Sequence, residues 1–499
     1  MSTGSETPAG ATSLRRLRQR ALSLGGANAF EYATQFLLPV VLARCLDTEA
    51  FGQYRLLWLA VGTVMAVAPL AMPASLYYFL PRSNRANKRL YINQTLAFLG
   101  FTGLLSGWAV STWNPWLPET MRGLGEHGAV VPAFVVLWVI ASLLDMLPAI
   151  EERVMWQAKA TVGLAGLRAL ALSLAAIVTG ELGPVLLVLL AFVVFKTGLL
   201  LAYVARHHGL RGPVLRRSAF PDQLRYATPF GAAGALYDLR AQADQWVAAA
   251  LFSLALFASF SIAAVIGTLV SLFRKSVNTV FLPSMSRLQA AGDLPGMLEL
   301  NSRANVMVGA LTCPLAAFAF VFAEEVVTII YTAAYVDAAP VMRLYVAGLL
   351  PLVVELASIT LLLRMGPFVV GVNLVAVLLA VPISWFAAQH FGLAGAAAGS
   401  VTMIYVDRIV TLRHIARHTG VPFRRLQDWR TLGVLIVCAA LAAGLAWGMV
   451  GHYFAAGGPL LRVIAGGVLM AVVYGFSIYG LWGRGRGALT AVRTPGHGA

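Results

Sequence analysis

The fold is decided by the stretch Arg225–Arg287, which reads RYATPFGAAGALYDLRAQADQWVAAALFSLALFASFSIAAVIGTLVSLFRKSVNTVFLPSMSR. It predicts two consecutive membrane-spanning helices, because each apolar run has the roughly 20 residues that a helix needs to cross a bilayer core. Five ionisable residues interrupt these runs: Asp238, Arg240, Asp244, Arg274 and Lys275. Such groups are costly in hydrocarbon and usually face a protein interior or a water-filled cavity. We therefore expect this helix pair to contribute to the functional site.

The composition extends this interpretation to the whole chain. Of 499 residues, 59% are hydrophobic and only 12% are charged, which excludes a soluble protein of this size. The net charge of +16 does not indicate nucleic-acid binding, because the basic residues lie in short loops between apolar runs. The three scattered cysteines and the histidine pairs in basic loops do not indicate a metal site.

Apolar runs of spanning length follow one another along the chain, and we count about fourteen. The first seven are Leu22–Ala43, Leu56–Leu80, Tyr91–Ser111, Ala129–Pro148, Val162–Thr179, Pro184–Val204 and Tyr226–Ala250. The others are Phe257–Leu282, Ala304–Phe322, Pro340–Leu363, Pro367–Ala388, Leu393–Leu412, Leu432–Val450 and Leu460–Leu481. The sequence thus predicts an all-α polytopic membrane protein.

Lys and Arg alternate between loops as the positive-inside rule requires. Basic clusters include Arg15–Arg20, Arg82–Arg89, Arg206–Arg217 and Arg413–Arg430, whereas the intervening loops are acidic. Both termini are therefore expected in the cytoplasm. We divide the chain into a basic, disordered N-terminus (1–21), an N-lobe (22–204), a basic linker (205–225), a C-lobe (226–412), a basic loop (413–431), two final helices (432–482) and a cytoplasmic tail (483–499).

One loop carries a recognisable signature. The run Leu42–Tyr54, LARCLDTEAFGQY, resembles the segment after the first helix of Wzx-type polysaccharide flippases, members of the multidrug/oligosaccharidyl-lipid/polysaccharide (MOP) exporter superfamily. Leu224–Pro229, Asp244, Pro283–Arg287 and Tyr331–Pro340 resemble the second half of such proteins. Ala258 departs from the pattern, since a glycine is common there.

The resemblance implies two six-helix lobes in a V around a central cavity, plus two C-terminal helices. It implies transport of an undecaprenyl-pyrophosphate-linked oligosaccharide from the cytoplasmic to the periplasmic leaflet by alternating access. It implies no enzyme activity and no cofactor, with protons or sodium as coupling ions. Membrane lipids and a polysaccharide polymerase or export machinery are the expected partners, and a monomer is the expected state.

Arg274 and Lys275 are candidates for contacting the anionic diphosphate, the alternative being that they reach toward the cytoplasmic headgroups. Adjacent residues on a helix point about 100° apart, so we expect at most one to face a cavity. Arg240 and Asp244 lie four residues apart and are expected to pair, as a structural bridge or as a charge relay. Asp238 is a further gating candidate that points elsewhere.

The first span carries a polar stripe, because Asn28, Glu31 and Gln35 recur at three and four residues and so share one face. We expect this stripe to line the cavity. Glu31 could hold a coupling proton or make a packing hydrogen bond, and Arg55 could contact substrate or anchor the second span at the interface. Secondary candidates in other spans are Asp145, Arg168, Lys196, Glu355, Asp407 and Arg408.

Other functions remain open at this point. Asp47-Thr48-Glu49 has the form of the acidic pair of polyprenyl-dependent glycosyltransferases, but Asp47 or Thr48 can equally cap a helix and the loop is short. A polysaccharide polymerase would need a large external loop. A cation-coupled drug exporter of the same superfamily is the nearer alternative, because one fold serves several substrates. A membrane scaffold without transport activity is the last alternative.

Overall fold

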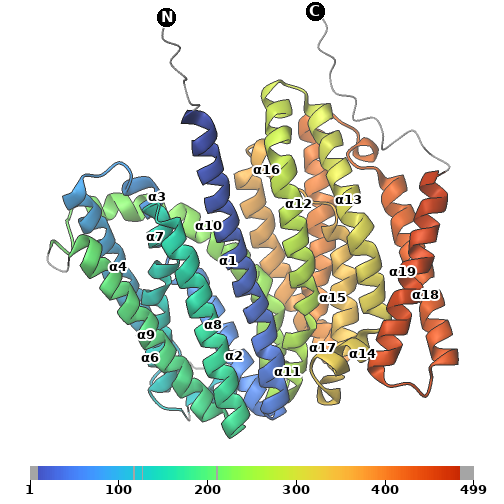
Figure 1. Ribbon diagram of the computed structural model, residues 1–499, viewed down its shortest axis with the longest axis horizontal. Helices are drawn as coiled ribbons and strands as arrows, with labels where there is room; N and C mark the ends of the chain where they lie inside the picture. The colour runs from blue at the N-terminus through green and yellow to red at the C-terminus, as the bar shows by residue number, and fades with distance from the viewer. Residues whose placement is uncertain (1–8, 116–118, 126, 210–211, 484–499) are drawn as a thin grey trace, which may run out of the picture. The chain divides into compact units, whose positions relative to one another are not determined.

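The computed structural model describes residues 9–115, 119–125, 127–209 and 212–483 (Figure 1). Regular secondary structure in these residues is entirely helical, so the predicted all-α fold class is confirmed. The helices before the middle of the chain are α1 (Ala9–Cys45), α2 (Thr48–Val67), α3 (Met72–Phe79), α4 (Arg85–Ala109), α5 (Glu119–Gly125), α6 (Val130–Ala141), η1 (Ser142–Asp145), α7 (Leu147–Ile150), α8 (Val154–Thr179), α9 (Leu182–His208) and α10 (Ala219–Leu251).

The second half is also built from helices and short 3₁₀ turns. They are α11 (Leu254–Ala263), α12 (Val265–Ala290), α13 (Leu294–Val321), α14 (Ala323–Ile330), η2 (Ala333–Tyr335), α15 (Ala338–Leu352), α16 (Ala357–Leu362), α17 (Gly366–Thr419), η3 (Phe423–Arg425), α18 (Trp429–Tyr453) and α19 (Pro459–Gly483). Every predicted span overlaps a helix or a pair of helices separated by a short break.

Eight helices in the described part of the chain are long and apolar enough to cross a membrane. The helices α1, α10 and α12 are not among them. These are the three helices on which the sequence places the polar stripe and the charges of Arg225–Arg287. Their polarity is consistent with helices that face protein or water along part of their length.

Helix ends and breaks differ from the predicted spans in places. The first helix begins at Ala9, so it includes basic residues that we expected to precede the span. The second span is broken between α2 and α3, where Leu70 and Ala71 have positive φ angles. By contrast, the spans expected at 367–388 and 393–412 correspond to two helical parts of α17, which meet at a kink at Gly392 (φ 65°) in the predicted gap between them. Glycine tolerates this conformation because it has no Cβ.

The chain forms two compact units. Unit 1 comprises the described residues of Met1–Gln242 and Phe252–Ala258, and unit 2 those of Ala243–Leu251 and Ser259–Ala499. The chain therefore passes from one unit to the other within α10. The lobe boundaries stated above, at 204 and 226, stay predictions.

Unit 1 is a helix bundle in which α1 packs on α8, α4 packs on α6, and α9 packs on both α6 and α8. Polar contacts attach the start of α10 to this bundle, because the fully buried Gln223 donates to Ser75 (2.9 Å) and Thr95 (3.0 Å). In the signature loop, Gly52 permits a close approach of backbone: a Cβ there would lie 2.2 Å from the carbonyl oxygen of Leu254.

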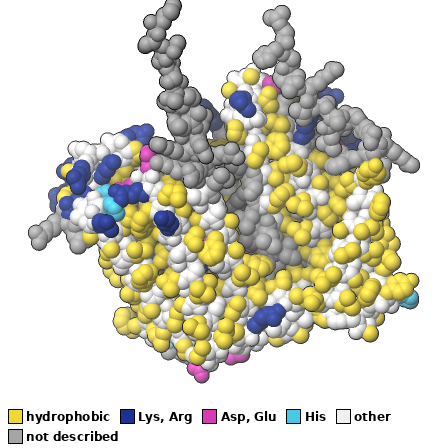
Figure 2. Space-filling model, in the orientation of Figure 1, with side chains coloured by type: hydrophobic (Ala, Val, Ile, Leu, Met, Phe, Trp, Pro, Cys, Tyr) yellow, Lys and Arg dark blue, Asp and Glu magenta, His cyan; other side chains and the backbone are white. Residues whose placement is uncertain are grey.

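Unit 2 packs α13 against α12, α15 and α18, while α15 also packs on α17 and α18 on α19. Its apolar core includes Met285, Phe322 and Leu435. On the face that Figure 2 shows, hydrophobic side chains cover the middle of each unit, and Lys and Arg side chains of unit 1 gather toward its upper end. A broad apolar surface on this face is suited to contact with the hydrocarbon of a bilayer.

Candidate functional site

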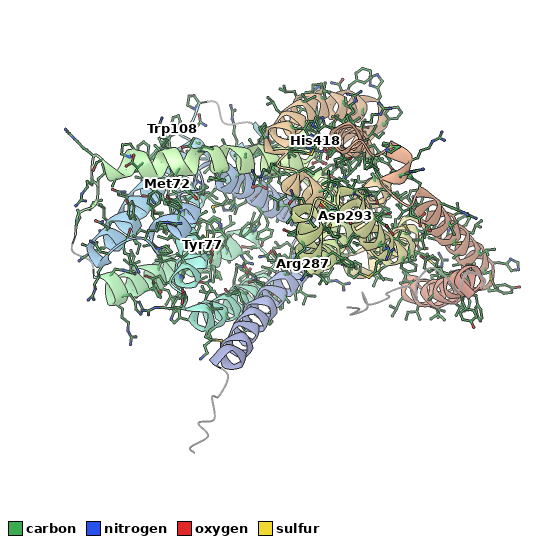
Figure 3. All side chains as sticks on the ribbon, turned by 90° about the horizontal axis from the view of Figure 1, so that it is seen from above. Met72, Tyr77, Trp108, Arg287, Asp293 and His418 are labelled. Atoms are coloured by element: carbon green, nitrogen blue, oxygen red, sulfur yellow. The ribbon has the colours of Figure 1, made fainter. Side chains whose placement is uncertain are left out.

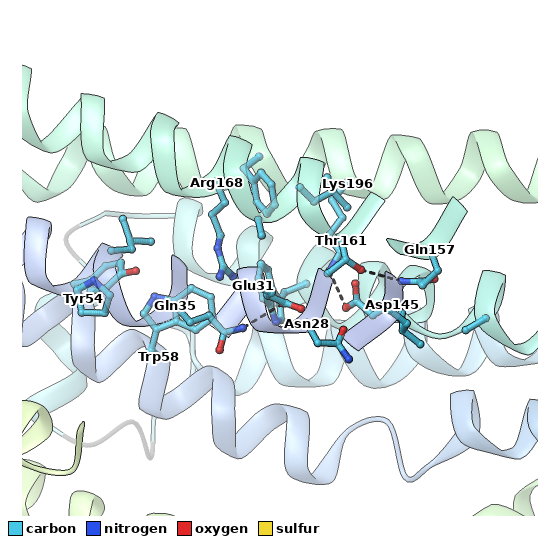
Figure 4. A pocket seen from close by; sticks show the side chains of 18 of the residues that line it. Asn28, Glu31, Gln35, Tyr54, Trp58, Asp145, Gln157, Thr161, Arg168 and Lys196 are labelled. Carbon is cyan, nitrogen blue, oxygen red and sulfur yellow. Dashed lines mark hydrogen bonds and ion pairs between the residues drawn. The ribbon is translucent and has the colours of Figure 1, made fainter. Parts of the chain in front are cut away.

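A cavity of about 520 Å³ lies within unit 1 (Figure 4). This volume lies within the roughly 300–1,000 Å³ that is typical of ligand sites. Its wall is built by α1, α2, α3, α6, α7, α8, α9 and η1 and combines aromatic rings, amides and charged groups. Its ionisable members, apart from two tyrosines, are Glu31, Arg55, Asp145, Arg168 and Lys196. Figure 3 views unit 1 from above, with the cavity residue Tyr77 labelled among its helices.

The polar stripe of α1 forms one side of this cavity. Asn28, Glu31 and Gln35 all line it from one face of the helix, and Gln35 Nε2 donates to Glu31 Oε1 at 3.2 Å. Arg55 lines it from the start of α2 and also makes an interaction of its own. The structure thus brings together four of the residues singled out in the sequence. Their roles in binding or coupling stay predictions.

Two secondary candidates neutralise each other in the same cavity. Lys196 Nζ on α9 lies 2.8 Å from Asp145 Oδ2 in η1, and it also lies 5.1 Å from the ring centre of Trp138. The Lys196 side chain is buried, whereas that of Asp145 is 56% exposed. A buried ammonium needs a partner of this kind, because desolvation of an isolated charge is expensive.

Arg168 on α8 is a cavity cation that contacts aromatic rings. Its guanidinium carbon lies 5.7 Å from the ring centre of Trp58 and 6.0 Å from that of Trp138. It interacts electrostatically with Glu31, and Figure 4 shows the two side chains near each other. Within the described residues the guanidinium makes no hydrogen bond and no ion pair. Its donors are therefore available to a ligand in the cavity.

The sequence singles out Arg168 as a charge within a span but indicates no role for it. The signal that could have found it is the spacing of Gln157, Thr161 and Arg168, which are four and seven residues apart and so share one face of a helix. All three line the cavity. The spacing was hidden because two of these residues are not ionisable, and only charged groups stand out in an apolar span.

Arg274 lies in unit 2 and is already engaged by neighbouring groups. Its Nε lies 3.0 Å from Glu355 Oε2, and its Nη1 donates to the carbonyl oxygen of Leu352 at 2.9 Å. A role in binding substrate stays a prediction, with a structural role now visible beside it. The side chain of Lys275 lies outside the described residues.

Asp244 is buried in unit 2 and accepts a hydrogen bond from Tyr345 Oη at 2.7 Å. This contact with α15 means that Asp244 does not depend on Arg240 for a partner. Arg240 belongs to unit 1 and makes an interaction of its own, while Asp238 is exposed. The predicted Arg240–Asp244 pair and the gating role of Asp238 stay predictions.

Comparison with known families decides the broad identity. Residues 41–340, more than half of the chain, match the family model described as "Polysaccharide biosynthesis protein". The chain belongs to this family. A search of curated protein sequences found no match.

Solved structures show the fold of this family member. The lipid II flippase MurJ, in an inward closed conformation, matches with a TM-score of 0.68 at 12% identity, covering 92% of this chain and 99% of that one. An inward-facing multidrug-resistance MATE transporter of the MOP superfamily matches with 0.61 at 11% identity, covering 78% and 96%. A MOP transporter from Pyrococcus furiosus matches with 0.52 at 13% identity, covering 80% and 94%.

These comparisons confirm the family and fold that the sequence resemblance indicated. This polysaccharide biosynthesis family member is a multi-pass membrane protein with the fold of MOP-superfamily transporters. The structures it resembles are those of transporters and a flippase. At such low identity they define the fold alone, and the side chains that line the cavity have to indicate the substrate.

Proposed function

We propose that the protein translocates an undecaprenyl-pyrophosphate-linked oligosaccharide from the cytoplasmic to the periplasmic leaflet of a bacterial inner membrane, with both termini in the cytoplasm. The unit 1 cavity would receive the polar headgroup while the polyprenyl tail stays in lipid. The product would serve assembly of an exopolysaccharide, capsule or O-antigen. The family match supports the connection with polysaccharide, and the basic loops support the orientation.

The observation that carries the proposal is a polar cavity with an available guanidinium at the middle of a spanning helix. Arg168 is the fifteenth residue of the 26-residue α8, so both ends of the helix are more than about 15 Å away at 1.5 Å per residue. Polar side chains at this depth are costly and indicate a path for a polar substrate. The cavity holds three cations and two carboxylates, counted as Arg55, Arg168 and Lys196 against Glu31 and Asp145. This balance favours an anionic headgroup over a cationic drug.

The proposal includes the coupling ion, the oligomeric state and the proteins that receive the product. Glu31 faces the cavity beside Gln35 and Arg168, so it can exchange a proton as the headgroup moves. Protons or sodium would drive transport, and no cofactor would be needed. A monomer would suffice, and polymerase or export machinery would take over the product.

A deletion of the gene in its own bacterium tests the proposal. We expect loss of a surface polysaccharide and accumulation of its polyprenyl-linked precursor on the cytoplasmic side, measured by mass spectrometry of extracted lipids. Wild-type protein should restore export, and Arg168→Gln at equal abundance should not. The matched control is Arg303→Gln, because Arg303 is exposed and pairs with Glu299 one turn away. Normal polysaccharide with new sensitivity to cationic drugs would refute the flippase and favour a drug exporter.

A further inference from the structure

Three cavity residues form a row along one face of α8. Gln157, Thr161 and Arg168 line the same cavity, and Gln157 precedes Arg168 by eleven residues. At 1.5 Å per residue their Cα atoms are about 16 Å apart along the helix axis. The row is therefore longer than a diphosphate or a single sugar ring, and a ligand that touches both ends must be extended.

Gln157 has an unmet requirement for a hydrogen-bond donor. Its side chain is 4% exposed, and its Nε2 is directed to Thr161 Oγ1 at 3.4 Å. Its Oε1 is buried and has no partner within the described residues. A buried acceptor without a donor costs free energy, so a ligand that supplies one gains affinity. Phosphate diesters carry only acceptors, whereas sugar hydroxyls also donate.

The other end of the row offers one guanidinium for an anion. Lys196 is paired with Asp145, and Arg168 has its donors available between Trp58 and Trp138. Guanidinium binds carboxylate through two parallel hydrogen bonds, and the aromatic walls provide apolar contact for sugar rings. Glu31 lies within the electrostatic range of Arg168, which reduces the net positive charge there. A group with a single negative charge suits this balance better than a diphosphate.

We propose that this row recognises an acidic oligosaccharide: Arg168 binds the carboxylate of a uronic-acid type of sugar residue, and Gln157 accepts a hydroxyl proton from another sugar ring of the same chain. This rests on the proposed function and deepens it, because it names the acidic class of oligosaccharide. It also places the sugar part of the headgroup, rather than its diphosphate, against α8.

Binding of two free disaccharides to the full chain in lipid nanodiscs tests the proposal. The probes are digalacturonate and its neutral counterpart galactobiose, measured by saturation-transfer NMR with titration. We expect digalacturonate to bind about tenfold more tightly, and Arg168→Gln to abolish this preference. Arg168→Lys should retain part of it, because charge remains while the paired geometry is lost. Gln157→Leu should weaken both probes, and Arg303→Gln should change neither.

Equal binding of the two probes, or binding of neither, would overturn the proposal. Displacement of digalacturonate by an equal concentration of inorganic pyrophosphate would also overturn it, since Arg168 would then bind the diphosphate. Transport separates this inference from the proposed function. If polyprenyl-diphosphate lipids with acidic and neutral headgroups are flipped equally, only the acidic assignment fails. If neither is flipped, the flippase itself fails.

Discussion

Glu151 shows how one residue between two helices can join three elements of unit 1. It lies between α7 and α8, accepts a hydrogen bond from Tyr203 Oη on α9, and has His208 Nε2 2.6 Å from its Oε1. Burial alone would raise the pKa of the Glu151 carboxyl, but the hydrogen bonds from His208 and Tyr203 outweigh it and lower that pKa below its usual value.

This lowered pKa predicts a pH-dependent contribution to stability. A depressed carboxyl pKa stabilises the fold fully above the unfolded value of about 4.3, and the contribution is lost as pH falls through the folded value. We expect Glu151→Gln to lower the thermal unfolding temperature of purified protein at pH 7, with a difference from wild type that shrinks below about pH 4. Glu299→Gln, at an exposed pair, should have little effect at either pH. A Glu151→Gln difference independent of pH would contradict this account.

At the residue scale the sequence predicted which residues share one helix face, because that signal is local. The α1 stripe followed from spacings of three and four, and Asn28, Glu31 and Gln35 do line one cavity. Pairings between distant residues could not be predicted. Asp145 and Lys196 are 51 positions apart, and nothing in an apolar span indicates which distant charge will neutralise which. Such a long-range contact neutralises Lys196, whereas Arg168 makes no ion pair within the described residues.

At the element scale, the break between α15 and α16 explains the position of Arg274. The helix α15 ends at Leu352, one residue after Pro351, and its final carbonyl accepts from Arg274 Nη1. Glu355 pairs with Arg274, accepts from the Ala357 backbone N–H at the start of α16, and donates its own N–H to Asn305 Oδ1 at 3.1 Å. Non-helical backbone within a membrane is tolerated only where its polar groups are satisfied in this way.

A substitution series at this break separates structural and substrate roles of Arg274. Arg274→Met leaves Glu355 buried without its partner, so we expect the free energy of unfolding to fall by about 3–5 kcal/mol. The double variant Arg274→Met/Glu355→Leu should recover most of this loss, as measured by chemical unfolding in detergent. If the double variant is stable but does not export polysaccharide, Arg274 contacts substrate as the sequence indicated. A stable single variant would contradict the structural role.

The sequence predicted the presence of the spanning helices better than the breaks within them. Long apolar runs identify spans because length and hydropathy are local properties. The kink at Gly392 lies in the predicted gap between residues 388 and 393, whereas the break at Leu70 and Ala71, which have positive φ angles, lies inside the single predicted span Leu56–Leu80. Pro351 was a visible signal for the α15 break, since proline limits helix continuation, but its satisfied polar network was not visible.

At the scale of the whole molecule, family and fold followed from the signature Leu42–Tyr54 and from the sequence of spans. The charged hairpin Arg225–Arg287 first suggested a working surface in the second half. That surface stays a prediction, and the described cavity of 520 Å³ lies in unit 1 and includes none of the five charges of the hairpin. The sequence alone cannot separate the two roles of a buried charge, because the cost of burying it is the same whether it binds substrate or stabilises a helix break.

The central claim is that the unit 1 cavity moves an anionic sugar headgroup across the membrane. Its most direct test is transport by purified full-length protein in proteoliposomes that contain a polyprenyl-diphosphate-linked acidic oligosaccharide with a fluorescent headgroup. Headgroup translocation is followed by a membrane-impermeant quencher. We predict translocation faster than in protein-free vesicles, reduced to background by Arg168→Gln and unchanged by Arg303→Gln. Translocation no faster than in protein-free vesicles, or equally fast with Arg168→Gln, would contradict the claim.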